Sequence, residues 1–240
     1  MMELNADLGE GMGTDEAIMP YIQSCNIACG GHTGNDQTMQ GTIRLALQHK
    51  VKIGAHPSYP DRVNFGRISI KMDKECLKAN ILDQIQSLDT LIKENGGTLN
   101  HIKPHGALYN DAAKNPEVAE LMVELVRQYY SGVALFVPFK SVIEDKARTA
   151  GIDYRIEGFA DRNYFADGSL IPRQHPKAVL TSITEVLAHV GRMAEDHVIQ
   201  CLDGTLIPVQ IQTLCVHGDN PKAVQLAKAI SSHLQLIRSA

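Results

Sequence analysis

Short apolar runs alternate with longer helix-like segments along nearly the whole chain, and this alternation strongly constrains the fold. The runs 51–55, 133–137 and 211–216 are short and rich in β-branched or aliphatic residues, which is typical of buried strands. Between such runs lie segments with helix start and stop signals, such as Asp73 before one segment and Gly96 after it. Regular strand–helix alternation predicts a mainly parallel sheet.

The length of the chain suits one closed α/β barrel. It has 240 residues, of which 44% are hydrophobic and 21% charged, so a sizeable core can be buried. No linker, charge block or low-complexity stretch divides the sequence. We therefore expect a single domain over residues 1–240.

Charge and cysteine usage narrow the class of protein. The 23 basic and 27 acidic residues give a formal net charge of -4, and no Lys/Arg run is interleaved with aromatics. Nucleic acid and membrane are therefore not expected as partners. The first residues lack the basic flank and apolar run of a signal peptide, and no apolar stretch reaches the roughly 18 residues of a membrane span. The five cysteines have no secreted-scaffold spacing, so we expect a cytoplasmic protein with small buried thiols.

Polar, glycine-flanked clusters follow the apolar runs at the point where each run stops. The clusters are 5–11, 26–32, 54–57, 101–106, 157–162 and 217–221. In a barrel of parallel strands the carboxyl ends meet on one face, which is where active sites lie. The loops 57–70 and 161–175 are long enough to cover such a site.

Strand periodicity groups some of these polar residues. Side chains two positions apart share a face, so Asn5 lies with Asp7, and His101 and His105 flank Lys103. A lysine on a buried strand is costly to desolvate, so packing alone does not account for this pattern. It indicates a functional site.

The residue types suggest roles in acid–base chemistry. Asp7 can orient or activate water, His56 and His105 can carry protons near neutral pH, and Lys103 can stabilise negative charge. We predict these four as catalytic. Substrate binding is predicted for Asn5, Glu10, Asn26, His32, Arg62, Arg67, His217 and Asp219. Plainer readings stay open, because glycines permit tight turns, Asp219 can cap a helix and the arginines can be ordinary loop residues.

Metal binding is the competing chemistry. Asp7, His32 and His56 are the natural divalent-metal candidates, although their spacing matches no strong motif such as His-Glu-x-x-His. The sequence also has no Gly-x-x-x-x-Gly-Lys-Ser/Thr loop, no Gly-x-Gly-x-x-Gly and no Gly-x-Ser-x-Gly. These absences disfavour a stand-alone P-loop ATPase and a serine hydrolase.

Taken together, the clusters resemble the LamB/YcsF family, the A subunits of prokaryotic 5-oxoprolinase. The resemblance rests on six ordered motifs: NADLGEG at 5–11, SCNIACGGHT at 24–33, IGAHPSYPDRVNFGR at 53–67, HIKPHGALYN at 101–110, EGFADRNY at 157–164 and CVHGD at 215–219. It implies an irregular seven-stranded β/α barrel of the polysaccharide-deacetylase-like type. It also implies a cyclic amide hydrolase that converts 5-oxoproline to glutamate with ATP (and Mg²⁺) and acts with two other subunits, B and C.

Within that scheme, the substrate carboxylate is expected near Lys103 or Arg62, and Asp7 and His105 would activate water and protonate the departing nitrogen. Two alternatives remain: a metal-dependent deacetylase or amidohydrolase, and a non-catalytic substrate-binding subunit. The deacetylase Asp-Asp pair is replaced by Asn5-Ala6-Asp7, and its second histidine by Asp36. A bound catalytic metal is therefore left open.

Overall fold

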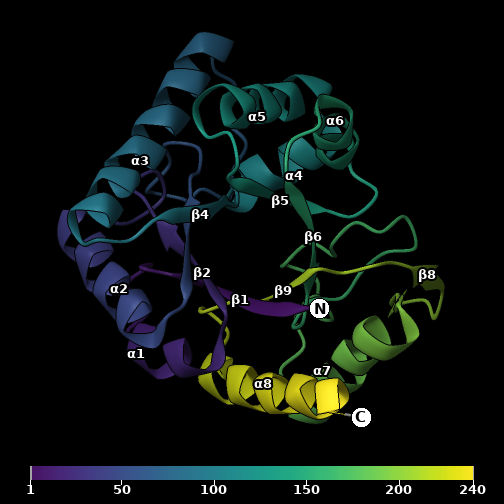
Figure 1. The fold of residues 1–240 in the computed structure, drawn as a ribbon. Coiled ribbons are helices and arrows are strands. Elements are labelled where there is room, and N and C mark those ends of the chain that lie inside the picture. Colours follow the sequence, from purple (N-terminus) through teal and green to yellow (C-terminus); the bar gives the residue numbers. More distant parts are fainter. Residues whose placement is uncertain (1, 240) are drawn as a thin grey trace.

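The computed structural model describes residues 2–239 and shows a closed barrel of seven parallel strands (Figure 1). The strand order is β1-β2-β3-β4-β5-β6-β9, and β9 closes the ring by pairing with both β1 and β6. The strands are β1 (Glu3–Leu8), β2 (Ser24–Ala28), β3 (Lys52–His56), β4 (Leu99–Ile102), β5 (Ala134–Pro138), β6 (Tyr154–Phe159) and β9 (Thr213–Val216). The predicted seven-stranded β/α barrel is confirmed.

Helices surround the barrel on its outer side (Figure 1). They are α1 (Asp15–Ile18), α2 (Asp36–His49), α3 (Lys74–Glu94), α4 (Gly106–Lys114), α5 (Pro116–Tyr129), α6 (Val142–Ala150), α7 (Ile183–Gly191) and α8 (Ala223–Ser239), with a 3₁₀ turn at Met19–Tyr21 and a π turn at Arg192–Asp196. Their starts follow the sequence signals: the Asn35 side chain accepts from the backbone of Thr38, and Asp73 accepts from the backbone of Cys76. Among residues 2–239, no helix combines the length and apolar character needed to cross a membrane.

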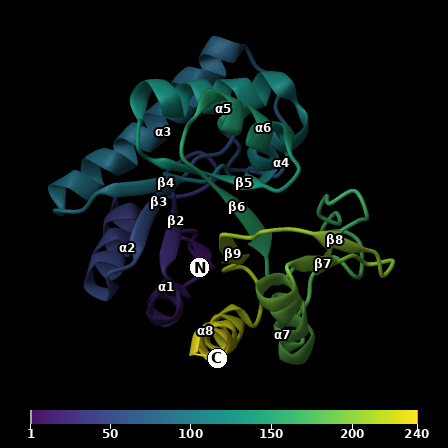
Figure 2. The ribbon, with the colours of Figure 1, turned by 45° about the vertical axis from the view of Figure 1, so that its right-hand side comes forward.

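Two features of the chain between β6 and β9 interrupt the strand–helix alternation. Helix α7 begins only at Ile183, because the preceding residues run beside the end of β6, where Val179 forms a bridge with Arg162. An antiparallel ribbon, β7 (Val198–Gln200) with β8 (Leu206–Pro208), lies beside the barrel (Figure 2).

The barrel is irregular where β3 pairs with β4. The register shifts between Ile53 and Gly54. The His101 ring occupies the space next to Gly54, where a Cβ would lie only 2.1 Å from its Nε2 atom, and it stacks on Phe136 with ring centroids 4.0 Å apart. Glycine at position 54 therefore lets a histidine ring lie inside the barrel.

The differing burial of the five cysteine thiols makes the packing of the protein testable by chemical labelling. Burial raises the pKa of Cys25 and of Cys29 to about 12 and holds the pKa of Cys215 well above its usual value. Cys201 is also buried, whereas Cys76 is exposed, contrary to the expectation that all five thiols are buried.

We expect iodoacetamide to label only Cys76 rapidly near neutral pH, and all five thiols after unfolding in urea. Mass spectrometry that finds a second rapidly labelled site in the native protein would contradict this packing.

Candidate functional site

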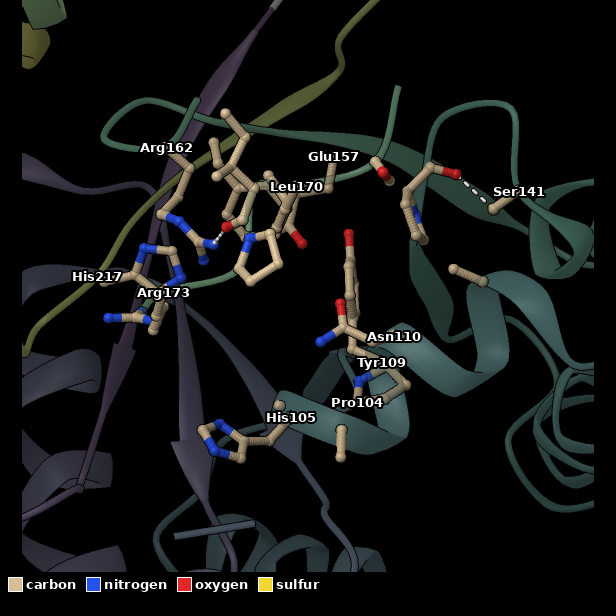
Figure 3. Close-up of a pocket in the computed structure, with 18 of the residues that line it drawn as sticks. Pro104, His105, Tyr109, Asn110, Ser141, Glu157, Arg162, Leu170, Arg173 and His217 are labelled. Atoms are coloured by element: carbon tan, nitrogen blue, oxygen red, sulfur yellow. Dashed lines mark hydrogen bonds between the residues drawn. The ribbon is translucent and has the colours of Figure 1, made fainter. Parts of the chain in front are cut away.

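A cavity of about 730 Å³ lies at the carboxyl ends of the barrel strands (Figure 3). Side chains from the ends of β1, β3, β6 and β9 line it, together with the start of α4 and the loop that follows β6. This loop, from Gly168 to Gln174, forms one wall of the cavity. The volume falls within the range of small-molecule sites.

A buried ion cluster lies at the base of the cavity. The Lys103 ammonium donates to Asp7 Oδ1 (2.8 Å) and to the Cys215 sulfur (3.1 Å), and pairs with Glu157 Oε1 (3.0 Å). Burial alone would lower the pKa of Lys103, but the two carboxylates outweigh it and hold that pKa well above its usual value. Burial would raise the pKa of Asp7, but His56 and Lys103 together hold it well below its usual value. Lys103 and Asp7 are therefore both charged.

Two side-chain amides from deeper in the barrel form hydrogen bonds to this cluster. Asn26 Nδ2 donates to Asp7 Oδ1 and to Asn5 Oδ1, both at 2.8 Å, and Asn5 Nδ2 donates to Glu157 Oε1 at 3.0 Å. Strands β1 and β6 are separated by β9, so the bond between Asn5 and Glu157 crosses the barrel interior. Burial and nearby Lys103 lower the pKa of His101 to about 3, so its Nε2 reaches Asn26 Oδ1 (2.7 Å) from a neutral ring.

Three histidines and a glutamate form a second buried group beside Asp7. His56 Nε2 lies 3.4 Å from Asp7 Oδ2 and 3.0 Å from His105 Nδ1. The His32 ring stacks on His105 with centroids 3.7 Å apart, and Glu10 Oε1 lies 3.2 Å from His32 Nε2.

The electrostatics of this group follow from its burial. Burial, reinforced by the negative charge of Asp7, raises the pKa of Glu10 to about 7. Burial, together with neighbouring His56, holds the pKa of His105 well below its usual value, and burial lowers the pKa of His32 to about 3. His32 and His105 are therefore neutral near physiological pH.

An aspartate–histidine pair lies on the other side of the cavity. His217 Nδ1 lies 2.8 Å from Asp161 Oδ1, and Asn220 donates to Asp161 Oδ2 at 3.0 Å. Burial would raise the pKa of Asp161, but His217 and Asn220 lower it below its usual value. The ionised carboxylate holds the proton of His217 on Nδ1, which leaves Nε2 as the second ring nitrogen for proton transfer.

The mouth of the cavity carries cations. Arg67 and Arg173 both pair with Asp219, at 2.6 and 3.1 Å. Arg162 instead donates to the carbonyl of Ile171 and so holds the loop wall in place. Figure 3 shows Arg162, Arg173 and His217 together on one side of the pocket.

Two buried polar atoms at the cavity have no partner within residues 2–239. They are the hydroxyl oxygen of Tyr109 and Oε2 of Glu157. Burial and nearby Glu157 hold the pKa of Tyr109 well above its usual value, so the phenol keeps its proton. The cavity thus offers one hydrogen-bond donor and one acceptor to a ligand.

The LamB/YcsF family model matches residues 2–238. This chain belongs to the LamB/YcsF family. The crystal structure of a lactam utilization protein from Thermus thermophilus superimposes with a TM-score of 0.92 at 36% identity, over 99% of this chain and 97% of that one. A family 4 carbohydrate esterase from Streptomyces lividans in complex with acetate gives a TM-score of 0.46 at 11% identity, over 98% of this chain and 88% of that one.

Eight of the predicted site residues of this LamB/YcsF chain line the cavity. They are Asp7, Glu10, His56, Arg67, Lys103, His105, His217 and Asp219. Asn5 and Asn26 lie deeper in the barrel, and His32 lies behind His105. Arg62 donates to the carbonyls of Gly30 and Gly34, so it ties two loops together outside the cavity lining.

Sequence reasoning did not select several of the residues just described, among them Glu157, Asp161, Tyr109 and Arg173. Glu157 and Asp161 stand in a polar cluster at a strand end, so their position was a usable signal. Tyr109 lies one helical turn after His105, and Arg173 lies in a loop whose only signal was its length.

Proposed function

We propose that this LamB/YcsF chain is the A subunit of an ATP-dependent 5-oxoprolinase. With two further subunits, B and C, it opens the lactam of 5-oxoproline to give glutamate, coupled to hydrolysis of ATP to ADP and phosphate. Family membership and the similarity to a lactam utilization protein support the substrate class. The cytoplasmic location expected from the sequence is part of the same proposal.

The observation that carries the proposal is the set of groups around one cavity. A 5-oxoproline molecule presents a ring carbonyl, a ring N–H and a carboxylate. Tyr109 can donate to the carbonyl, Glu157 Oε2 can accept from the N–H, and the arginines at the mouth can bind the carboxylate. We place the carboxylate near Arg67 and Arg173.

This placement replaces the one expected from the sequence. Lys103 already directs its ammonium to two carboxylates and a sulfur, so it has no N–H left for a substrate. Arg62 directs its guanidinium to backbone carbonyls away from the cavity. Lys103 therefore balances the charge of Asp7 and Glu157, and Arg62 stabilises the loops.

The chemistry explains why ATP is needed. An unstrained lactam resists water because amide resonance must be lost, and phosphorylation of the lactam oxygen would make its carbon a better electrophile. Asp7 would then hold the attacking water by a hydrogen bond. His217, oriented by Asp161, would pass a proton from that water to the departing nitrogen, and a second water would release phosphate from the γ-glutamyl phosphate that remains. His105, expected from the sequence in this role, is neutral and directs its only ring hydrogen to the carbonyl of Phe65, so it has no proton to give.

The cavity also suits a phosphate-bearing co-substrate in volume and charge. Its lining includes the cations Arg67, Lys114, Lys140, Arg162 and Arg173, in addition to the already paired Lys103. These side chains support ATP, with Mg²⁺, as the co-substrate of the complex.

Reconstitution tests the function. Glutamate formation from 5-oxoproline is measured with subunits B and C, with and without this chain, and with and without ATP. We expect glutamate only when this chain and ATP are both present. Turnover without ATP would instead favour the metal-dependent amidohydrolase, which the buried histidines and Glu10 make the strongest alternative. Turnover without this chain would contradict the proposal.

The order of steps has its own test. With ¹⁸O in the lactam carbonyl, phosphorylation of that oxygen predicts label in the released phosphate. Unlabelled phosphate would exclude the phosphorylated lactam, while leaving the overall reaction intact.

A further inference from the structure

We propose that Glu10, His56 and His105 form a binding site for a divalent transition-metal ion at the base of the cavity. This set differs from the sequence-based candidates Asp7, His32 and His56. The proposal concerns binding of an ion to this chain alone, and it does not depend on 5-oxoprolinase activity.

The positions of the ring hydrogens show which nitrogens of His56 and His105 can bind a metal ion. His56 Nδ1 lies 2.7 Å from the carbonyl oxygen of Lys103, and His105 Nε2 lies 2.9 Å from that of Phe65. A carbonyl oxygen only accepts, so both of these nitrogens bear hydrogen. In the neutral rings, His56 Nε2 and His105 Nδ1 are then lone-pair atoms.

These two lone-pair atoms face each other at 3.0 Å. Two acceptors at that distance repel unless a cation or a proton lies between them. Two nitrogens each about 2.1 Å from an ion, at roughly a right angle, lie about 3 Å apart. Histidine ligands of metals also typically donate their other N–H to a backbone carbonyl, as both rings do here.

Glu10 supplies the third ligand. Its Oε1 lies 3.6 Å from His105 Nδ1, and ligand atoms of Glu10, His56 and His105 all lie within 4.8 Å of one another. All three side chains are buried, and Asp7 Oδ2 approaches His56 Nε2 to 3.4 Å as a neighbouring carboxylate. Two imidazoles with carboxylate suit Zn²⁺ or Co²⁺ better than Mg²⁺.

Neighbouring residues hold the set in place. His32 packs flat on His105 and directs Nε2 to Glu10, so it orients both. Gly66, at a φ of +64°, brings its loop so close that an added Cβ would lie 2.9 Å from His32 Cβ and 3.0 Å from His105 Cδ2. The rings therefore have little freedom to turn away from the site.

The competing explanation is a proton on His56, which would donate to His105 and be balanced by Asp7. To distinguish a metal ion from a proton, the protein is treated with a chelator and then titrated with Co²⁺ alone. Visible absorption and calorimetry measure the binding. We expect one ion per chain, displaced by Zn²⁺, and a melting temperature that rises with the ion. His105→Gln and Glu10→Gln should each weaken binding about tenfold or more.

His217→Gln is the matched control, because it removes a cavity histidine outside the set and should bind Co²⁺ like the wild type. Circular dichroism verifies that each variant is folded. The proposal would be overturned if the folded wild type bound no stoichiometric Co²⁺. It would also be overturned if His105→Gln and Glu10→Gln bound Co²⁺ as tightly as the wild type. Loss of binding in His217→Gln alone would place the ion with Asp7 and Cys215 instead, and would overturn it too.

Discussion

Replacing Asp7 with asparagine is expected to lower glutamate formation by the reconstituted complex about 10²-fold or more. The side chains have nearly the same shape, so the change removes the negative charge while Lys103 keeps its pair with Glu157. Without that charge, neither the attacking water nor His56 is held as in the wild type. The measurement is steady-state turnover with saturating ATP and 5-oxoproline, accompanied by thermal unfolding of the isolated chain.

The matched control is Asp83→Asn, an exposed aspartate on α3. It makes the same chemical change away from the cavity and should leave turnover unchanged. If Asp7→Asn turns over at a similar rate to Asp83→Asn, Asp7 has no part in the reaction and our assignment of its role is wrong.

Replacing Lys103 with methionine is expected to lower the free energy of unfolding by about 3–5 kcal/mol. The methionine fills similar space, but Asp7 and Glu157 then remain buried without their shared cation. Urea denaturation of the isolated chain measures the loss. Because this readout is independent of the partner subunits, it tests the ion cluster even if the proposed reaction is wrong.

Two controls separate this effect from the loss of any lysine. Lys52→Met breaks an exposed pair with Glu3, whose side chains are 47% and 34% accessible, and should cost about 0–1 kcal/mol. Adding Glu157→Gln to Lys103→Met removes one of the two uncompensated charges and should restore part of the stability. Equal losses for Lys103→Met and Lys52→Met would contradict the buried cluster.

The sequence was sufficient to predict the barrel and the face that bears the site. Strand–helix alternation predicts parallel strands, and polar residues that follow each strand must then meet at one end. Asp7, His56, His105 and His217 come from four separate polar clusters, yet all line one cavity. Position relative to strand ends was therefore an informative signal.

The depth and direction of side chains could not be predicted in the same way. Asn5 and Asp7 share a face of β1, but only Asp7 reaches the cavity, whereas Asn5 lies one layer deeper. Arg62 and Arg67 lie in the same loop, yet one turns to backbone carbonyls and the other to Asp219. Such differences depend on the path of the loop, which local patterns do not encode.

Residue pairs that form across the barrel could not be predicted from the sequence either. Asp161 and His217 are 56 positions apart, and Asn5 and Glu157 are 152 apart. Each residue was visible in a polar cluster, but its partner is set by the order in which the strands close the barrel. The histidine tautomers of the proposed metal site likewise depend on carbonyls brought near by the folded loops.

A crystal structure of this chain grown with 5-oxoproline tests the proposed substrate site most directly. We expect the ring in the cavity, with its carbonyl near Tyr109, its N–H near Glu157 and its carboxylate near Arg173. Electron density for the ligand on any other surface, with this cavity free of it, would contradict the proposed site.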